Sequence, residues 1–456
     1  MPVSAARTIA FEVLRRVEAE GAYASDLLHA ELGANVKPAD AALATELTLG
    51  VLRWRRLLDV LLERQLKTPL VRLDLPVALA LRMGLYQLRF LERVPARAAV
   101  NESVELVKRA KKSSAASLVN AVLRRLADEA TKPADELLPA SASPAERLAI
   151  FHSHPTWMVE RWLARWGEAR TVRLLEANNR APRLSCALHE ATRQREVFGA
   201  LEKDGLRVEP GRLLRLAFAV SGGSPARTEI FHKGWISIQD EASQAIPLLL
   251  NVQAGDYVLD LCAAPGGKTA ALVRAAGQRG VVVAADRHAH RLRAMRDQFM
   301  RLGLRDVTLV ELDATQPLPF DHKFQRILAD APCSGTGTLA RHPEIRWRLE
   351  PRQLAELHEM QVTMLASAAG HLAPGGRLVY STCSMEPEEN EEVVAEVLRE
   401  ERSIRLVGTS EATRSLAAHL VPGADLSNLF ADGGEFLTFP GEQPMDGFFA
   451  AIMQKK

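Results

Sequence analysis

One stretch constrains this 456-residue chain more than any other, namely Asp260-Leu261-Cys262-Ala263-Ala264-Pro265-Gly266-Gly267-Lys268-Thr269. The apolar residues just before it predict a short buried strand that ends at Asp260, and residues 268–276 suit a helix. A strand, a tight turn and a helix in this order are typical of an open α/β sheet, in which ligands bind beyond the carboxyl ends of the strands. The paired glycines, lacking Cβ atoms, let backbone amides at the helix start approach a ligand closely.

Three interpretations of this loop compete. A phosphate-binding P-loop needs glycine at position 262, where this chain has cysteine. The dinucleotide pattern G-x-G-x-x-G does not fit residues 262–269 either. The sequence of the loop alone also allows a plain βα turn that binds no ligand. The rest of the carboxyl half argues against this third interpretation.

Length and composition set the broad class. A chain of 456 residues exceeds the usual size of one hydrophobic core, so we expect several domains. The first residues show neither a secretion signal nor a long apolar span, which predicts a cytoplasmic protein. The four cysteines lie far apart without a C-x-x-C pair, so we expect no disulfide and no bound metal.

Positive charge is concentrated near the amino terminus. Residues 1–130 carry 20 Lys or Arg against 15 Asp or Glu, although the whole chain has a net charge of only +2. Two clusters stand out, one at Arg53, Arg55 and Arg56, the other at Lys108, Arg109, Lys111 and Lys112. Such clusters usually form a solvated helix face, and a polyanionic partner is the alternative.

The periodicity divides the chain into successive regions. Residues 1–127 have apolar residues at helical spacing throughout and predict an all-α bundle. Residues 128–150 lose this periodicity and predict a linker. Residues 151–238 predict a helix followed by a small α+β subdomain, because strand-like runs there alternate with turn signals.

Residues 239–456 alternate strands with helices, which predicts a doubly wound, mostly parallel sheet. Its expected strands cover residues 257–261, 281–286, 307–313, 326–330 and 376–381, with long helices at 291–302 and 353–372. A last pair at 403–407 and 447–453 is expected to add an antiparallel edge.

Four of these strands end in a carboxylate, at Asp260, Asp286, Asp313 and Asp330. Parallel strands are buried on both faces, so aspartate is disfavoured inside them and suits their carboxyl ends. Asp286 ends the second strand, where an acidic residue binds the two hydroxyls of a ribose. Helix capping explains any one of these residues equally well, but it explains all four together poorly.

Two cysteines follow two of the strands. Cys333 lies in Ala329-Asp330-Ala331-Pro332-Cys333-Ser334-Gly335-Thr336-Gly337, and Cys383 lies in Tyr380-Ser381-Thr382-Cys383-Ser384. A single cysteine is usually a small buried apolar residue. Two thiols at adjacent strand ends beside an aspartate, with Lys268 near them, favour a reactive thiolate instead.

The three motifs together resemble the S-adenosylmethionine-dependent RNA cytosine-5 methyltransferases. The order of pieces in residues 1–127 resembles the NusB-type RNA-binding domain, and the whole chain is similar to the bacterial Sun/Fmu/RsmB-type enzymes that act on small-subunit (16S) ribosomal RNA. This resemblance implies a Rossmann-like methyltransferase domain at 239–456 and a monomer that binds ribosomal RNA, without a membrane or a metal.

The resemblance also implies roles for individual residues. Cys383 is the nucleophile that adds to carbon 6 of cytosine, Asp330 contacts the N3 edge of the base, and Cys333 assists product release. S-adenosylmethionine is held by Cys262, Ala263, Ala264, Pro265, Gly266, Gly267, Lys268, Asp286, Asp313 and Asp330. Arg341 and Arg346, on the loop after Cys333, are expected to contact RNA near the target base.

Two other classes of function compete with this one. A non-catalytic RNA-binding or ribosome-assembly protein would keep the fold, but it would not need both thiols and all four carboxylates. A methyltransferase for a small molecule or a protein would leave the basic helical region and the paired cysteines without a function. We therefore predict an RNA cytosine-5 methyltransferase.

Overall fold

The computed structural model describes residues 3–33, 36–129, 132 and 142–456 of the chain. These residues form two compact units. The first contains Met1–Ala181 together with Leu339–Arg348, and the second contains Pro182–Thr338 together with Leu349–Lys456. Most of the predicted linker, residues 130–131 and 133–141, lies outside the described residues.

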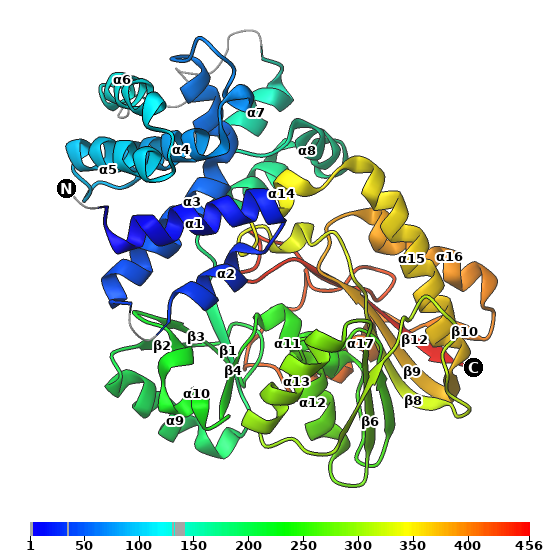
Figure 1. Cartoon of the computed structure of the whole chain (residues 1–456). Coiled ribbons are helices and arrows are strands. Elements are labelled where there is room, and N and C mark those ends of the chain that lie inside the picture. The colour runs from blue at the N-terminus through cyan, green and yellow to red at the C-terminus, as the bar shows by residue number, and fades with distance from the viewer. Residues whose placement is uncertain (1–2, 34–35, 130–131, 133–141) are drawn as a thin grey trace. The chain divides into compact units, whose positions relative to one another are not determined.

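The first unit is all helical, as predicted (Figure 1). Its helices are α1 (Ala5–Glu20), α2 (Ala24–Glu31), α3 (Pro38–Glu63), α4 (Leu75–Phe90), α5 (Ala96–Arg109), α6 (Ala116–Ala127), α7 (Pro144–Phe151), α8 (Thr156–Asn179) and α14 (Ile345–Arg348). One core forms because residues at helical spacing, such as Leu47, Val51 and Leu58 of α3, are buried against the neighbouring helices. Pro38 begins α3, where its missing N–H is not needed.

Two features of this unit differ from the expected boundaries. Helix α7 occupies the end of the predicted linker, and the Ser143 hydroxyl caps it by accepting a hydrogen bond from Glu146 N. Helix α8 groups with the amino-terminal helices, whereas the sequence placed it with the α+β subdomain. Trp162 of α8 is 1% exposed, so it is a core residue rather than a platform for stacking bases.

The second unit begins with a small antiparallel sheet in the order β2-β3-β1-β4. Its strands are β1 (Leu184–Leu188), β2 (Arg207–Pro210), β3 (Ala217–Ser221) and β4 (Ile236–Ile238), and α9 (Gln194–Lys203) and α10 (Glu229–His232) accompany them. Cys186, Val197 and Phe218 share its core. The predicted α+β subdomain is confirmed, and Cys186 is one of its fully buried apolar residues.

The larger sheet of this unit has the order β10-β12-β9-β8-β5-β6-β7, with β11 (Phe436–Thr438) paired to β12. Its strands are β5 (Tyr257–Asp260), β6 (Val281–Asp286), β7 (Val307–Glu311), β8 (Phe324–Asp330), β9 (Leu372–Thr382), β10 (Ile404–Leu406) and β12 (Phe448–Lys455). The strands from β7 to β9 run parallel, and β12 and β10 add the expected antiparallel edge.

Helices cover both faces of this sheet, because its strands are apolar on both sides (Figure 1). Val258 and its neighbours pack with α11 (Glu241–Leu249), α12 (Gly267–Ala276) and α17 (Thr409–Ala417). Leu259, on the opposite face, belongs to the core formed with α15 (Pro351–Gly370) and α16 (Glu391–Glu400). Helix α13 (Ala289–Arg301) packs on β6 and β7. The doubly wound architecture is confirmed. No helix in the described part of the chain is long and apolar enough to cross a bilayer.

Candidate active site

The candidate site lies where the winding of the large sheet reverses. From β5 the chain continues to β6 and β7 on one side, and then returns to β8 and β9 on the other. Ligands of open α/β sheets bind at such a switch point, beyond the carboxyl ends of the strands. Asp260 ends β5 and Asp330 ends β8, so both carboxylates lie at this point.

The loop after β5 is fixed to both neighbouring strands. Leu261 N donates to Leu328 O at 2.9 Å, and Ala263 N donates to Ala285 O at 2.8 Å. The loop then turns into α12 at Gly266, whose φ of 100° favours glycine. A Cβ atom at Gly266 would also lie 2.8 Å from Met295 Cγ, so the turn requires this residue.

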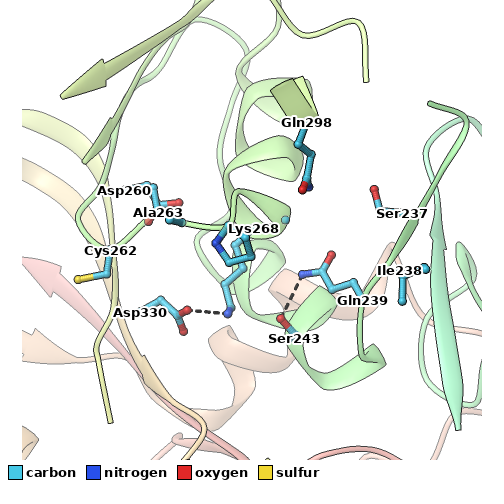
Figure 2. A pocket seen from close by; sticks show the side chains of 13 residues that line it. Ser237, Ile238, Gln239, Ser243, Asp260, Cys262, Ala263, Lys268, Gln298 and Asp330 are labelled. Atoms are coloured by element: carbon cyan, nitrogen blue, oxygen red, sulfur yellow. Dashed lines mark hydrogen bonds and ion pairs between the residues drawn. The ribbon is translucent and has the colours of Figure 1, made fainter. Parts of the chain in front are cut away.

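A cavity of about 150 Å³ opens beside this loop (Figure 2). Asp260 lines it together with seven of the predicted cofactor residues, namely Cys262, Ala263, Ala264, Pro265, Gly267, Lys268 and Asp330. The opposite wall contains Ser237 and Ile238 of β4, Gln239, Ser243 of α11 and Gln298 of α13. The small antiparallel sheet therefore completes the cavity, which the sequence did not predict.

Lys268 and Asp330 form an ion pair across the cavity floor (Figure 2). Lys268 Nζ donates to Asp330 Oδ2 at 2.6 Å, and Ser381 Oγ donates to Asp330 Oδ1 at 2.7 Å. Burial acts to lower the pKa of Lys268, but the charge and the hydrogen bond of Asp330, together with the other acidic groups nearby, hold this pKa above its usual value. Lys268 is therefore a fixed positive charge beside Asp330.

Asp260 is buried behind this pair, with 1% exposure. Thr269 Oγ1 donates to its Oδ2 at 2.7 Å, whereas its Oδ1 has no hydrogen-bond partner. Burial raises the pKa of Asp260 to about 7. Asp260 Oδ1 is thus a buried acceptor without a hydrogen bond, on a residue that lines the cavity.

Asp286 and Asp313 lie outside the cavity lining, further along the same edge of the sheet. Asp286 accepts a hydrogen bond from His288 N at 2.9 Å and pairs with Arg291, whose other Nη atom donates to Ala264 O. Asp313 follows β7 and accepts from Thr315 N and Oγ1, which lowers its pKa. Both carboxylates are thus held in place, but at a distance from the Lys268–Asp330 pair.

The two predicted thiols meet at the ends of β8 and β9. Cys333 Sγ lies 3.3 Å from Cys383 Sγ, and Cys383 N donates to Cys333 Sγ at 3.3 Å. Both side chains are partly exposed, whereas Thr382 and Ser384 around Cys383 are buried. The hydrogen bond with Cys383, together with burial, raises the pKa of the Cys333 thiol. Because Asp330 pairs with Ser381 in β9, the thiols lie next to the Lys268–Asp330 pair.

The structure corrects one predicted site residue. Arg346 is 1% exposed, and its guanidinium donates to Ser153 O, Asn178 O, Asn179 Oδ1 and Leu339 O. Its guanidinium is thus occupied by acceptors of the first unit, which argues against the expected contact with RNA. Arg341 is partly exposed and remains a candidate.

The first basic cluster is also structural. Arg53 donates to Ala340 O, Arg55 pairs with Glu18, and Arg56 donates to His154 O. In the second cluster, Lys108, Arg109 and Lys111 are exposed at the end of α5. This second cluster therefore remains a candidate surface for a polyanion.

Comparison with known proteins covers nearly the whole chain. Family models match residues 4–128 as "NusB family", residues 154–226 as "Methyltr_RsmF/B-like, ferredoxin-like domain" and residues 247–454 as "16S rRNA methyltransferase RsmB/F". The probable ribosomal RNA small subunit methyltransferase B of Bacillus subtilis is 33% identical over 100% of both chains. This chain belongs to the RsmB/F family of 16S rRNA methyltransferases.

Other relatives agree with membership in the RsmB/F family. Ribosomal RNA small subunit methyltransferase B of Erwinia tasmaniensis is 33% identical over 99% of this chain and 98% of that protein. The crystal structure of PH0851 has the same fold, with a TM-score of 0.81 over 100% of both chains and 24% identity. A methyltransferase homologue from Pyrococcus horikoshii matches 69% of this chain and 100% of its own, at 27% identity and a TM-score of 0.57. The expected resemblance to the bacterial RsmB-type enzymes with a NusB-type domain is confirmed.

Proposed function

We propose that this RsmB/F family member transfers a methyl group from S-adenosylmethionine to carbon 5 of a cytosine in 16S rRNA, through a covalent bond between Cys383 and carbon 6. The observation that supports this proposal most is the pair of thiols 3.3 Å apart beside the Lys268–Asp330 ion pair. Methylation of oxygen or nitrogen needs no covalent step, so such a pair would have no function in it.

The residues around the cavity fit the cofactor. Asp260 lines the cavity, and its buried Oδ1 makes no hydrogen bond of ordinary geometry, which suits a polar group of a ligand in the cavity. The glycine turn exposes the start of α12, and Asp286 supplies a carboxylate suited to ribose hydroxyls. Residues 262–268, Asp286 and Asp330 would therefore hold S-adenosylmethionine, with Asp313 near its adenine. When bound, this cofactor supplies an electrophilic methyl group.

The residues near the two thiols have separate roles in the reaction. Cys383 adds as a thiolate to carbon 6 of cytosine and makes carbon 5 nucleophilic. Asp330 lies at the N3 edge, and a proton passed from the Lys268–Asp330 pair to N3 neutralises the negative charge that develops on the ring as the thiolate adds. After methylation, Cys333 assists loss of the carbon 5 proton, and cleavage of the carbon–sulfur bond then restores the aromatic ring and frees Cys383.

A cytosine stacked in a duplex does not reach Cys383, so the target base is unpaired or flipped outward. The first unit grips the surrounding RNA through its exposed basic residues, and Arg341 contacts the RNA near the target. Phosphate contacts of this kind position the substrate without reading its sequence.

The product tests the proposal. The full-length protein is incubated with unmodified 16S rRNA and methyl-labelled S-adenosylmethionine, and the RNA is digested to nucleosides. We expect the label in 5-methylcytidine, and its absence with Cys383→Ala. Label in N4-methylcytidine, or label in 5-methylcytidine that persists in Cys383→Ala, would contradict the proposed mechanism.

A further inference from the structure

A buried carboxylate lies beneath the two thiols, and no role has been assigned to it so far. Glu389 ends a 3₁₀ turn (Pro387–Glu389) after β9 and is 0% exposed. A carboxylate is costly to bury unless hydrogen-bond donors surround it. The donors around Glu389 are neutral N–H and O–H groups. Their positions show which parts of the chain this carboxylate joins.

These donors come from the residues that directly follow the two cysteines. Ser334, after Cys333, donates its backbone N–H to Glu389 Oε1 at 2.7 Å and its hydroxyl to Oε2. Ser384, after Cys383, donates its hydroxyl to the same Oε2. The two hydroxyl oxygens lie 3.0 Å apart. One carboxylate thus binds both cysteine-bearing loops.

Further contacts fix Glu389 itself. Gln361 of α15 donates to Glu389 Oε1 at 3.1 Å and also to Pro332 O at 2.8 Å. Tyr380 Oη donates to Glu389 O at 2.6 Å, and Asn390 Nδ2 donates to Ser384 O at 2.9 Å. Glu389 is therefore held in place by α15 and β9, and Asn390 at the start of α16 holds Ser384, which Glu389 binds.

We propose that Glu389 is a positioning residue that sets the separation of Cys333 and Cys383. Its catalytic consequence depends on the proposed function, in which both thiols act on one pyrimidine ring. Functional groups must be held within about 0.5 Å of their productive geometry, and a misplacement of about 1 Å costs on the order of a hundredfold in rate. Without the carboxylate, Ser334 and Ser384 lose their common acceptor, and the two loops are joined only by their remaining contacts, such as the hydrogen bond from Gly337 N to Cys383 O.

The separation of the thiols is measured without RNA. The full-length protein is equilibrated in buffers of reduced and oxidised glutathione, and peptide mapping after alkylation gives the fraction with a Cys333–Cys383 disulfide. This fraction and the concentrations of reduced and oxidised glutathione give the effective concentration of the Cys333 thiol relative to the Cys383 thiol. We expect Glu389→Ala to lower it at least tenfold, and Glu392→Ala, at an exposed position of α16, to leave it within twofold. An unchanged value in folded Glu389→Ala would overturn the proposal.

The catalytic consequence is measured as the rate of covalent adduct formation in the Cys333→Ala background. We expect Glu389→Gln to slow adduct formation at least tenfold while the Kd for S-adenosylmethionine stays within twofold, because the cavity residues do not contact Glu389. Equal loss of both quantities would indicate general unfolding and contradict a positioning role.

Two variants that each remove one hydrogen bond to Glu389 test the proposal if the Glu389 variants do not fold. Ser334→Ala and Ser384→Ala each remove one hydroxyl donor, and we expect each to lower the effective concentration of the thiols severalfold. Values equal to the wild-type value in both would refute the positioning role. If Cys333→Ala with intact Glu389 forms no adduct, the covalent mechanism fails, whereas the glutathione measurement still tests Glu389.

Discussion

Asp260 holds a proton near neutral pH because burial disfavours its charge. Burial raises its pKa to about 7, compared with about 3.9 in an unfolded chain. The folded state therefore gains stability from this proton below about pH 4, and loses the gain as the pH rises through 7. The hydrogen bond from Thr269 and the charge of Lys268 offset only part of the effect.

We predict that Asp260→Asn removes this dependence on pH. Between pH 4 and pH 8, wild-type stability should fall relative to that of Asp260→Asn by a few kcal/mol, the free energy of such a pKa difference. Thermal unfolding of both proteins without cofactor measures the change. Asp297→Asn, at an exposed position of α13, is the control and should follow the wild type. Parallel curves for Asp260→Asn and wild type would contradict the prediction.

Some site residues were predictable from sequence and others were not. Asp330, Cys333 and Cys383 were found because each follows a strand of a parallel sheet, where side chains face the ligand. Glu389 was missed because it is one of five glutamates within residues 386–392 at a helix start, where solvated carboxylates are usual. Arg346 was assigned to RNA because it lies on the loop after Cys333, and its burial could not be read from the sequence.

The short helix α14 and the residues before it are packing elements of the first unit. Trp347 Nε1 donates to Leu52 O, Arg348 donates to Val17 O, and Ala24 N donates to the buried Glu344. Arg346 is the centre of this packing, with four protein acceptors. Leu339–Arg348, which belongs to the first unit, has no clear hydrophobic periodicity, so the sequence did not predict that it packs there.

We predict that Arg346→Ala lowers stability by about 3 kcal/mol, because several buried oxygens lose a charged donor. Chemical denaturation followed by circular dichroism measures this change. Arg352→Ala removes an arginine whose side chain is 76% exposed, so it should change stability by less than about 0.5 kcal/mol. Wild-type stability in Arg346→Ala, combined with weaker RNA binding, would restore the RNA-contact interpretation.

The turn after Cys333 packs directly against the Cys383 loop and the start of β12. Gly337 N donates to Cys383 O at 2.9 Å, and Gly447 N donates to Gly337 O at 2.8 Å. A Cβ atom at Gly337 would overlap the carbonyl of Gly447 and lie 2.9 Å from Cys383 O. Only glycine therefore allows the two cysteine-bearing loops to approach this closely.

We predict that Gly337→Ala lowers stability by about 1–3 kcal/mol through overpacking, and that it reduces the methylation rate more than cofactor affinity. Thermal unfolding and initial rates measure the two effects. Gly370→Ala is the matched control, since an added Cβ there meets nothing within 4 Å. A fully active and stable Gly337→Ala variant would show that the close approach is unnecessary.

At the scale of the whole molecule, the order of the helical, α+β and doubly wound regions was predictable from the change in periodicity. Parallel strands such as β6 stand out as short runs of apolar, largely β-branched residues between helices. The grouping of α8 with the first unit was not predictable, because it depends on which neighbours its apolar face contacts. The same limit applies to the cavity wall formed by β4.

The exposed cluster Lys108, Arg109 and Lys111 gives a prediction for RNA binding. Each phosphate contact contributes roughly 0.7–0.9 to the slope of log K against log salt concentration. We expect the triple alanine variant to bind 16S rRNA more weakly and to lower this slope by about 2. Fluorescence anisotropy at several salt concentrations measures both quantities. Arg399→Ala with Arg402→Ala, in the second unit, is the control, and an unchanged slope in the triple variant would place the RNA elsewhere.

The central claim is that Cys383 bonds to the substrate and that Cys333 assists its release. Cys333→Ala is incubated with 16S rRNA and S-adenosylmethionine, and the mixture is separated under denaturing conditions. We predict a protein–RNA adduct that withstands denaturation and that disappears in the double variant Cys333→Ala/Cys383→Ala. No adduct with the single variant, or an adduct that persists with the double variant, would contradict the account.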